Sequence, residues 1–302
     1  MLITAGVSLS LGIIFSAIGI AVTKGKQVRM FFKDGIRIVR DTELIQMEKT
    51  TIDSFKNIAI DVDAADIMLI ENDTDEFALE YKFETPSEDM QIIGVEDDTF
   101  KVTTNYEIFH FVLNFGGIFG VGNNDYYIKL YYPKGTEFDQ IKLESDAGDI
   151  FIEDTMVCNS LSIDTSAGKS VLKNVTGDMK VDMSAGSFTA DNCNFGHCDF
   201  NMSAGSVTLT NCVIDGGKFD MSAGGFKADQ LTLTKSLDLD MSAGSVKIVF
   251  VDGQEIGYDF DMSAGSAKIN GEKRGSEYQD KKGYDIILTI DSSAGSVDIT
   301  NK

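Results

Sequence analysis

The sequence predicts an all-β fold in which one unit is repeated along a single-stranded, parallel β-solenoid that resembles a β-helix. Three observations support this prediction. The hexapeptide DMSAGS, or a close variant of it, occurs five times between residues 182 and 266. Apolar residues alternate with polar ones on both sides of it, which is typical of strands with one buried face. No amphipathic helical pattern appears after residue 25.

The N-terminus is apolar, and we expect a transmembrane anchor over residues 1–23. Residues 2–23 carry no charge, and 22 residues are long enough to cross a hydrocarbon layer of about 30 Å as a helix. A signal peptide is the alternative, with Gly19-Ile20-Ala21 as its cleavage site. The lack of a basic stretch before the apolar run favours the anchor.

Charge is distributed unevenly along the chain. Residues 1–40 hold six Lys or Arg and one Asp, whereas the remainder holds 20 basic and 47 acidic residues. This predicts a basic juxtamembrane neck over 24–50 and a strongly acidic body. Such a body argues against nucleic acid as a partner, because phosphates require Lys and Arg, and it disfavours binding to anionic lipid.

Strands are also predicted before the repeats begin. We expect residues 51–140 to form an N-terminal β cap or the first layers of the same body. The stretch 58–73 has the strand, bend and strand pattern of the later repeats, with Ala64-Ala65 at the bend. Further strands are predicted at 77–83, 99–108 and 126–135.

The repeats occupy residues 141–302 and align on the glycine of a small tripeptide, most often Ser-Ala-Gly. Buried positions fall three and five residues before this glycine and two and four residues after it. The buried positions lie an odd number of residues before the glycine and an even number after it, which a straight strand cannot produce. The chain must therefore bend at the glycine, which tolerates unusual dihedral angles. Met stands three residues before the glycine in five units. The eight glycines are Gly148, Gly168, Gly186, Gly205, Gly224, Gly244, Gly265 and Gly295.

Polar turns separate the units, as in KNVTGD at 173–178 and DNCNFG at 191–196. If the units stack in parallel about 4.8 Å apart, equivalent residues form ladders. The longest spacing, 30 residues, contains the charged and glycine-bearing segment 270–283, which we expect to be an exposed loop.

Three features together resemble a known family: IAIDVDAADIMLIE at 58–71, YYIKLYYPKGTEFDQIKLESDAGDIFIED at 126–154, and the run of SAG units. The chain is similar over roughly 50–302 to the bacterial "putative adhesin" family of β-strand-repeat domains of unknown function, also called the toastrack domain. The resemblance implies a membrane anchor, an extracytoplasmic solenoid and association with envelope stress systems, and it implies no established enzyme activity. The positive-inside rule points the other way and places a body behind a basic neck in the cytoplasm, so the orientation stays open.

An acidic ladder is the first candidate site. The position four residues before the glycine is acidic in seven of the eight units and faces outward by parity. We consider a divalent cation, Ca²⁺, bound by carboxylates of this ladder, because hard cations take oxygen ligands. The alternative is that each Asp hydrogen-bonds to local backbone at the bend. No other cofactor is expected. The candidate ligands are Asp182, Asp220, Asp240 and Asp261.

The cysteines are the second candidate. Cys193 and Cys212 share the position seven residues after the glycine, where other units carry mainly aliphatic residues, so we expect both to be buried thiols. A disulfide between them is the alternative if the domain is exported. A zinc site from Cys193, His197 and Cys198 lacks a recognised spacing.

The segment 108–122 is the third candidate, because it is unusually apolar and rich in glycine. It either covers the open end of the solenoid or contacts a partner or membrane. The apolar side chains concerned are Phe109, Phe111, Phe115, Ile118 and Phe119.

Catalysis is not expected. The two histidines, His110 and His197, have no nucleophile motif near them, and paired-carboxylate hydrolysis is the chemistry that is hardest to exclude. The sequence therefore predicts a non-enzymatic, single-pass protein of the cell membrane that presents a rigid acidic solenoid for adhesion, sensing or scaffolding. The alternative is an accessory or regulatory subunit of a membrane envelope-stress response system. Its partners would be the membrane, through the N-terminal helix, and envelope ligands or stress-system proteins.

Overall fold

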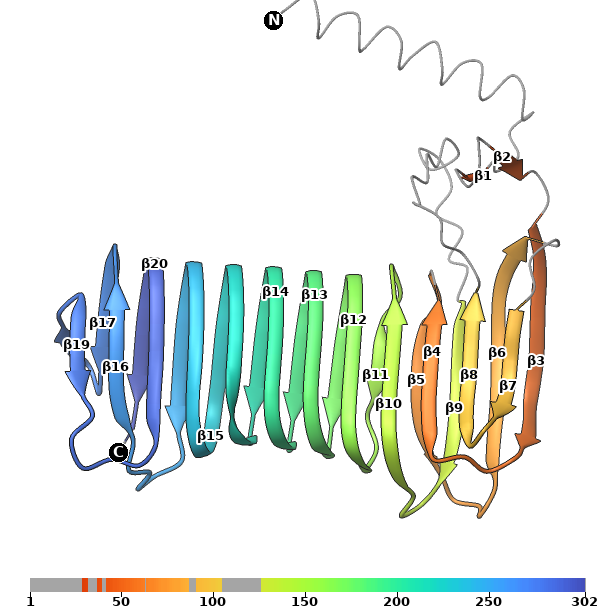
Figure 1. The fold of residues 1–302 in the computed structure, drawn as a ribbon, viewed down its shortest axis with the longest axis horizontal. Helices are drawn as coiled ribbons and strands as arrows, with labels where there is room; N and C mark the ends of the chain where they lie inside the picture. Colours follow the sequence, from red (N-terminus) through yellow and green to blue (C-terminus); the bar gives the residue numbers. More distant parts are fainter. Residues whose placement is uncertain are drawn as a thin grey trace, which may run out of the picture.

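The computed structural model describes residues 29–31, 37–39, 42–62, 64–86, 91–104 and 126–301. These residues form strands and turns without a helix, which confirms the all-β prediction. Figure 1 shows the strands side by side along one long axis, from the orange strands at one end to the blue strands at the other. A two-stranded antiparallel pair, β1 (Arg29–Phe31) and β2 (Arg37–Val39), precedes this stack.

No helix suited to crossing a membrane occurs among the described residues. The anchor predicted over 1–23 lies outside them. Within the predicted neck, residues 42–50 belong to strand β3 (Thr42–Ile52) of the stack.

The central repeats stack in parallel and in register. Each turn of the chain, here called a rung, consists of two strand segments joined at the Ser-Ala-Gly bend. Gly168, Gly186, Gly205 and Gly224 lie opposite one another in successive rungs, so the predicted ladders are present. These rungs belong to β12 (Met156–Lys173), β13 (Val175–Asp191), β14 (Asn194–Thr210) and β15 (Val213–Phe250).

The bend requires glycine for two physical reasons, seen clearly at Gly224. Its φ is 136°, in a region that side chains with a Cβ rarely adopt. A Cβ built there would also overlap the carbonyl oxygen of Gly205 in the neighbouring rung. The same overlap recurs along the whole glycine ladder, so the tripeptide is small because the next rung fills the space.

In three successive rungs, the opposite corner is an asparagine turn, and Gln230 takes the same left-handed conformation in the next rung. Asn174, Asn192 and Asn211 have φ between 51° and 54°, a left-handed conformation that Asn tolerates better than most residues. The N–H of Asn192 donates to the Thr210 carbonyl at 3.0 Å, which also links neighbouring rungs at this corner.

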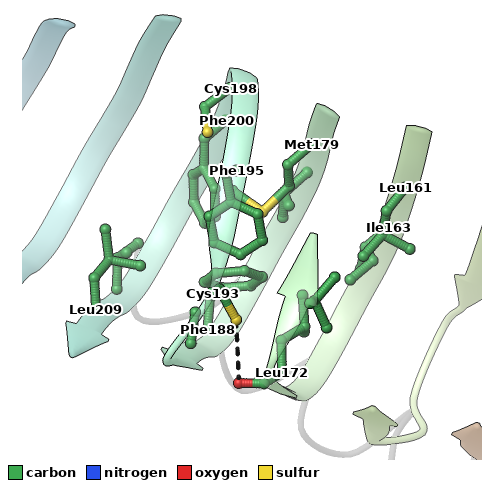
Figure 2. Close-up of a cluster of buried hydrophobic side chains, with 14 of the residues drawn as sticks. Leu161, Ile163, Leu172, Met179, Phe188, Cys193, Phe195, Cys198, Phe200 and Leu209 are labelled. Carbon is green, nitrogen blue, oxygen red and sulfur yellow. Dashed lines mark hydrogen bonds between the residues drawn. The ribbon is translucent and has the colours of Figure 1, made fainter. Parts of the chain in front are cut away.

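Ladders of large side chains fill the interior. Phe188, Phe200, Phe219 and Phe226 form a continuous aromatic row with ring centroids 5.0–5.2 Å apart. Figure 2 shows part of this cluster, where rings from neighbouring rungs pack against aliphatic and sulfur-bearing side chains. The methionines predicted to fill the space before the bend are all buried: Met183, Met202, Met221, Met241 and Met262.

The C-terminal rungs are not stacked in sequence order. The last strand, β20 (Ile287–Thr300), pairs in parallel with β15 on one side and with β16 (Gly257–Met262) and β17 (Gly265–Ile269) on the other. The segment 270–283 is largely exposed, as expected, but it is not only a loop. It contains β18 (Glu272–Arg274) and β19 (Glu277–Asp280), which cover the outer edges of β17 and β16 in antiparallel pairing.

The N-terminal end has the same design. The rung of β4 (Asn57–Val62) and β5 (Asp66–Asn72) lies between two other rungs. One is formed by β8 (Thr99–Thr104) and β9 (Tyr127–Pro133), and the other by β10 (Glu137–Ser145) and β11 (Ile150–Ile152). Ala65 continues the glycine ladder, because its carbonyl faces Gly148. Antiparallel strands then close this end, with β7 against β8, β6 against β9, and β3 against β6.

The remaining bounds at this end are β6 (Phe77–Pro86) and β7 (Gln91–Glu96). The predicted region 51–140 therefore supplies both the first layers and a cap.

Candidate functional site

The outer carboxylate ladder runs along the strand segments that precede the bend. None of its side chains is buried, in agreement with the parity argument. Asn201 separates Asp182 from Asp220 and donates from Nδ2 to Asp182 Oδ1 at 2.9 Å. Asp291 separates Asp240 from Asp261. In spatial order the ladder is Glu144, Asp164, Asp182, Asn201, Asp220, Asp240, Asp291 and Asp261.

Lysines pair with three of the first four carboxylates of this ladder, Asp164 being the exception. Each stands two residues before its carboxylate on the same face of the strand. The Nζ–carboxylate distances are 2.6 Å for Lys142–Glu144, 3.4 Å for Lys180–Asp182 and 2.8 Å for Lys218–Asp220. Opposite charges two residues apart on an exposed strand face contribute little stability individually, but they lower the repulsion along the ladder.

In the last part of the ladder, no lysine stands two residues before the carboxylate. Asp238 and Asp259 occupy the position that lysine holds in the earlier rungs, and Lys281 pairs with Asp259. Partial burial and the neighbouring carboxylates, Asp240 first and then Asp261, raise the pKa of Asp291 above its ordinary value. The C-terminal rungs therefore present a concentrated negative surface.

Calcium binding by this ladder remains a prediction. Among the residues that the structure describes, no three His, Cys, Asp or Glu side chains are grouped in a way that could hold a metal ion. Calcium takes six to eight oxygen ligands that converge on one point, whereas a ladder places its oxygens in a row. Titration calorimetry with Ca²⁺ would test whether Asp182, Asp220, Asp240 and Asp261 bind it.

A corner cleft of about 710 Å³ opens where successive rungs begin, beside the segment before β20. The N–H of His197 donates to Asp178 Oδ1 at 2.9 Å. Asp215 accepts hydrogen bonds of 2.6 Å from Thr234 Oγ1 and from Lys235 Nζ, which hold its pKa below its usual range. The lining residues are Asp178, His197, Asp215, Gly216, Gly217, Thr234, Lys235, Ser236, Asp285 and Ile286.

The side chains that line the cleft are mainly polar or charged. The Asp215 carboxylate, held ionised by Lys235 and Thr234, gives the cleft a hydrogen-bond acceptor paired with an ammonium group. Sequence reasoning missed this cleft, although a signal existed. Asp178, Gly196 and Asp215 stand ten residues after the bend glycine in three successive units, and His197 and Lys235 stand eleven after it.

A second polar cluster lies on the outer face at the N-terminal end. Glu80 on β6 accepts hydrogen bonds from Tyr127 at 2.7 Å, Tyr131 at 2.9 Å and Lys129 at 3.0 Å, all on β9. The ammonium group of Lys49 lies 3.8 Å from the Tyr131 ring centroid. The hydrogen bond to Glu80 raises the pKa of Tyr127 to about 12, and burial with the same carboxylate raises the pKa of Tyr131 to about 12.

The cysteines are buried free thiols, as the first alternative stated. Cys193 and Cys198 point into the core while His197 is exposed, so the three are not brought together as a zinc site. The apolar segment 108–122, with its five candidate contact residues, lies outside the described residues.

Comparison with known proteins gives one matching family and several similar solved structures. The model of the family described as Toastrack DUF4097 matches residues 55–301. A crystal structure titled as a putative adhesin from Parabacteroides distasonis ATCC 8503 is 11% identical, with 87% of this chain and 98% of that chain covered and a TM-score of 0.43. One from Bacteroides fragilis NCTC 9343 is 13% identical, with coverages of 86% and 97% and a TM-score of 0.34.

A third structure, titled as a putative cell adhesion protein from Clostridium sporogenes ATCC 15579, is 13% identical. It covers 87% of this chain and 99% of its own, with a TM-score of 0.26. No curated protein matches the chain.

Proposed function

The chain belongs to the toastrack DUF4097 family, and we propose that it is a non-enzymatic, membrane-anchored protein of the cell envelope. Its body would present a rigid acidic solenoid for adhesion, sensing or scaffolding. The anchor would be the uncharged run at 2–23, followed by the basic neck. No cofactor is part of this proposal.

The observation that carries the proposal is the matched register of successive rungs, which shifts only between Val157 and Ser160 and between Gly177 and Met179 in the pairings of β12 to β15. Neighbouring rungs are joined by backbone hydrogen bonds along both strand segments and at both corners. A body built this way resists bending, because any bend must break a row of parallel hydrogen bonds. Chemically similar surface side chains then repeat about every 4.8 Å, which suits binding to a partner that is itself repetitive.

The side-chain chemistry supports a binding role over a catalytic one. The acids follow the structural period, several of them pair with lysine, and Asp215 in the corner cleft is held ionised by its partners. Catalytic carboxylates need separated pKa values and a shared substrate position. The outer ladder instead repeats a carboxylate from rung to rung, with Asn201 as the one amide among its eight members.

Labelling of a single exposed cysteine tests the location. Lys282 lies in the exposed turn after β19, so Lys282→Cys places a thiol at the surface, while the four native thiols are buried. On intact cells, a membrane-impermeant maleimide should label the variant and leave the unsubstituted chain unlabelled. Labelling only after the membrane is opened would place the body in the cytoplasm and reject an envelope-presenting role.

Deletion of residues 2–23 separates the presenting role from the regulatory one. If the body presents the surface, the shortened chain should still sediment with isolated cell-envelope fragments. If the chain is instead an accessory subunit of a stress-response system, a peptide of residues 1–50 should reproduce its effect on that response, and the body should be dispensable.

A further inference from the structure

Cys193 and Cys212 occupy the same place in neighbouring rungs. Each follows a left-handed asparagine and falls in the short break between two strand segments. The N–H of Val213 donates to the Cys193 carbonyl at 2.9 Å, which holds the two rungs together at this corner. Neighbouring parallel strands lie about 4.8 Å apart, and a disulfide spans about 4.4–6.8 Å between Cα atoms.

Both sulfur atoms point to the same side of this corner. The Cys193 thiol donates to the Leu172 carbonyl at 3.8 Å, drawn as the dashed line in Figure 2, and the Cys212 thiol is 3.6 Å from the Ala190 carbonyl. Each thiol has the other as its neighbour in the adjacent rung, and this neighbour raises the pKa of Cys193 and lowers the pKa of Cys212.

The other two cysteines have no such neighbour. Cys158 lies on β12 beside Gly177 of β13, and Cys198 lies on β14 opposite Gly217 of β15. Because β13 separates them, their backbones are about two strand spacings, or roughly 10 Å, apart. A disulfide cannot bridge that distance without moving a strand.

We propose that Cys193 and Cys212 form a redox-active pair that oxidises to an intramolecular disulfide and ties two neighbouring rungs together. The oxidant is a small disulfide such as oxidised glutathione. The Cys212 thiolate attacks it and releases one glutathione, and the Cys193 sulfur then displaces the second. Two S–H bonds and one S–S bond break, and the protein disulfide and two thiols form, so electrons and protons balance.

Access to the buried pair comes through local opening of the corner. Cys193 and Cys212 lie between strand segments, where fewer ladder hydrogen bonds must break than in the middle of a rung. The reaction is therefore slow relative to that of an exposed thiol, but it needs no global unfolding.

Thiol counting by mass spectrometry tests the proposal. The full-length reduced protein is incubated with oxidised glutathione under native conditions, acid-quenched, denatured and alkylated with iodoacetamide. We expect two alkyl groups in place of four, a single cross-linked peptide joining Cys193 to Cys212, and reversal by dithiothreitol. Four alkyl groups, a cross-link between chains, or a bridge that appears only in denaturant would overturn it.

Three variants serve as matched controls. Cys212→Ser should keep all three remaining thiols free after the same treatment. Cys193→Ser should stop at a mixed disulfide between Cys212 and glutathione, which leaves two alkylated thiols and no cross-linked peptide. Cys158→Ser should still form the bridge and retain one alkylated thiol. If Cys193→Ser forms a new bridge through Cys158 or Cys198, pairing is not set by the rung geometry and the proposal fails.

Discussion

Asp291 stands at a crowded position of the outer carboxylate ladder, and Asp291→Asn tests whether that ladder opposes folding. Its side chain lies between Asp240 and Asp261, one rung away on each side, without a lysine two residues earlier. Asn has the same shape and retains one carbonyl acceptor. The substitution therefore removes a charge with little change in packing.

The expected gain follows from Coulomb's law. Two like charges 4.8 Å apart in water repel by about 0.9 kcal/mol, and screening at 0.15 M salt roughly halves this value. Two neighbours together then destabilise the folded state by about 1 kcal/mol. For a body of this size, removal of that repulsion raises the melting temperature by about 2–4 °C.

The pH dependence has a definite sign. The pKa of Asp291 is raised in the folded state by partial burial and by neighbouring carboxylates. The ionised form therefore destabilises the folded state at pH values above that pKa, and the penalty disappears as the pH falls through it. Asp291→Asn should be more stable than the wild type at pH 7 and equal to it near pH 3.

Differential scanning fluorimetry or calorimetry measures the gain, with Asp220→Asn as the control. Asp220 already pairs with Lys218 at 2.8 Å and has Asn201 as a neighbour, so its substitution should bring no gain. The gain at Asp291 should also shrink in 1 M salt. A loss of stability, or a gain that persists at pH 3 or in 1 M salt, would show that repulsion is not its cause.

Three further predictions test other parts of the body. Gly224→Ala should destabilise the fold by at least about 3 kcal/mol or prevent folding, because its Cβ would overlap the next rung, whereas Gly225→Ala, whose Cβ would meet nothing closer than 3.7 Å, should melt like the wild type. Glu80→Gln should lower the pKa of Tyr127 from about 12 toward 10 in an absorbance titration at 295 nm; an unchanged value would remove the carboxylate as its cause. Asn192→Gly should be tolerated at φ 54°, and Asn192→Val should lower stability by about 1–2 kcal/mol in urea unfolding; equal stability would show that the left-handed corner is not strained.

The bend and the ladders could be predicted because their pattern recurs in every repeat. A parity change on either side of Gly, seen in successive units, indicates a bend at that glycine whatever the neighbouring fold. Ala65 shows the limit of the signal. It takes the ladder position of a glycine in the first rung, and only the strand, bend and strand pattern around it revealed the match.

The order of the last rungs could not be predicted. The rung of β16 and β17 and the rung of β20 carry the same apolar pattern and a similar small tripeptide, so either rung could pair beside β15. Backbone ladders do not distinguish between identical partners. The choice depends on where the segment 270–283 can cover an edge, which is a property of tertiary structure.

The corner cleft was missed for a different reason. Its residues come from successive rungs and fall in positions that the repeat pattern assigns to turns. Asp178 and His197 are separated by 19 residues in sequence and joined by a hydrogen bond only because the rungs stack in register. The lysine partners of the ladder were also missed, although Lys and an acid two residues apart recur at Lys142, Lys180 and Lys218.

The two ends of the stack explain why such a repetitive body stays finite. Parallel rungs with open edges would add further copies of themselves, as exposed strand edges do in aggregation. Here antiparallel strands cover the outermost parallel rung at each end of the stack. The rung of β4 and β5, which is first in sequence, and the rung of β20, which is last in sequence, each lie one rung further inside. Fraying of β20 must therefore break two ladders at once. A closed stack keeps its length fixed, so the chain carries a surface of defined size instead of growing into a fibre.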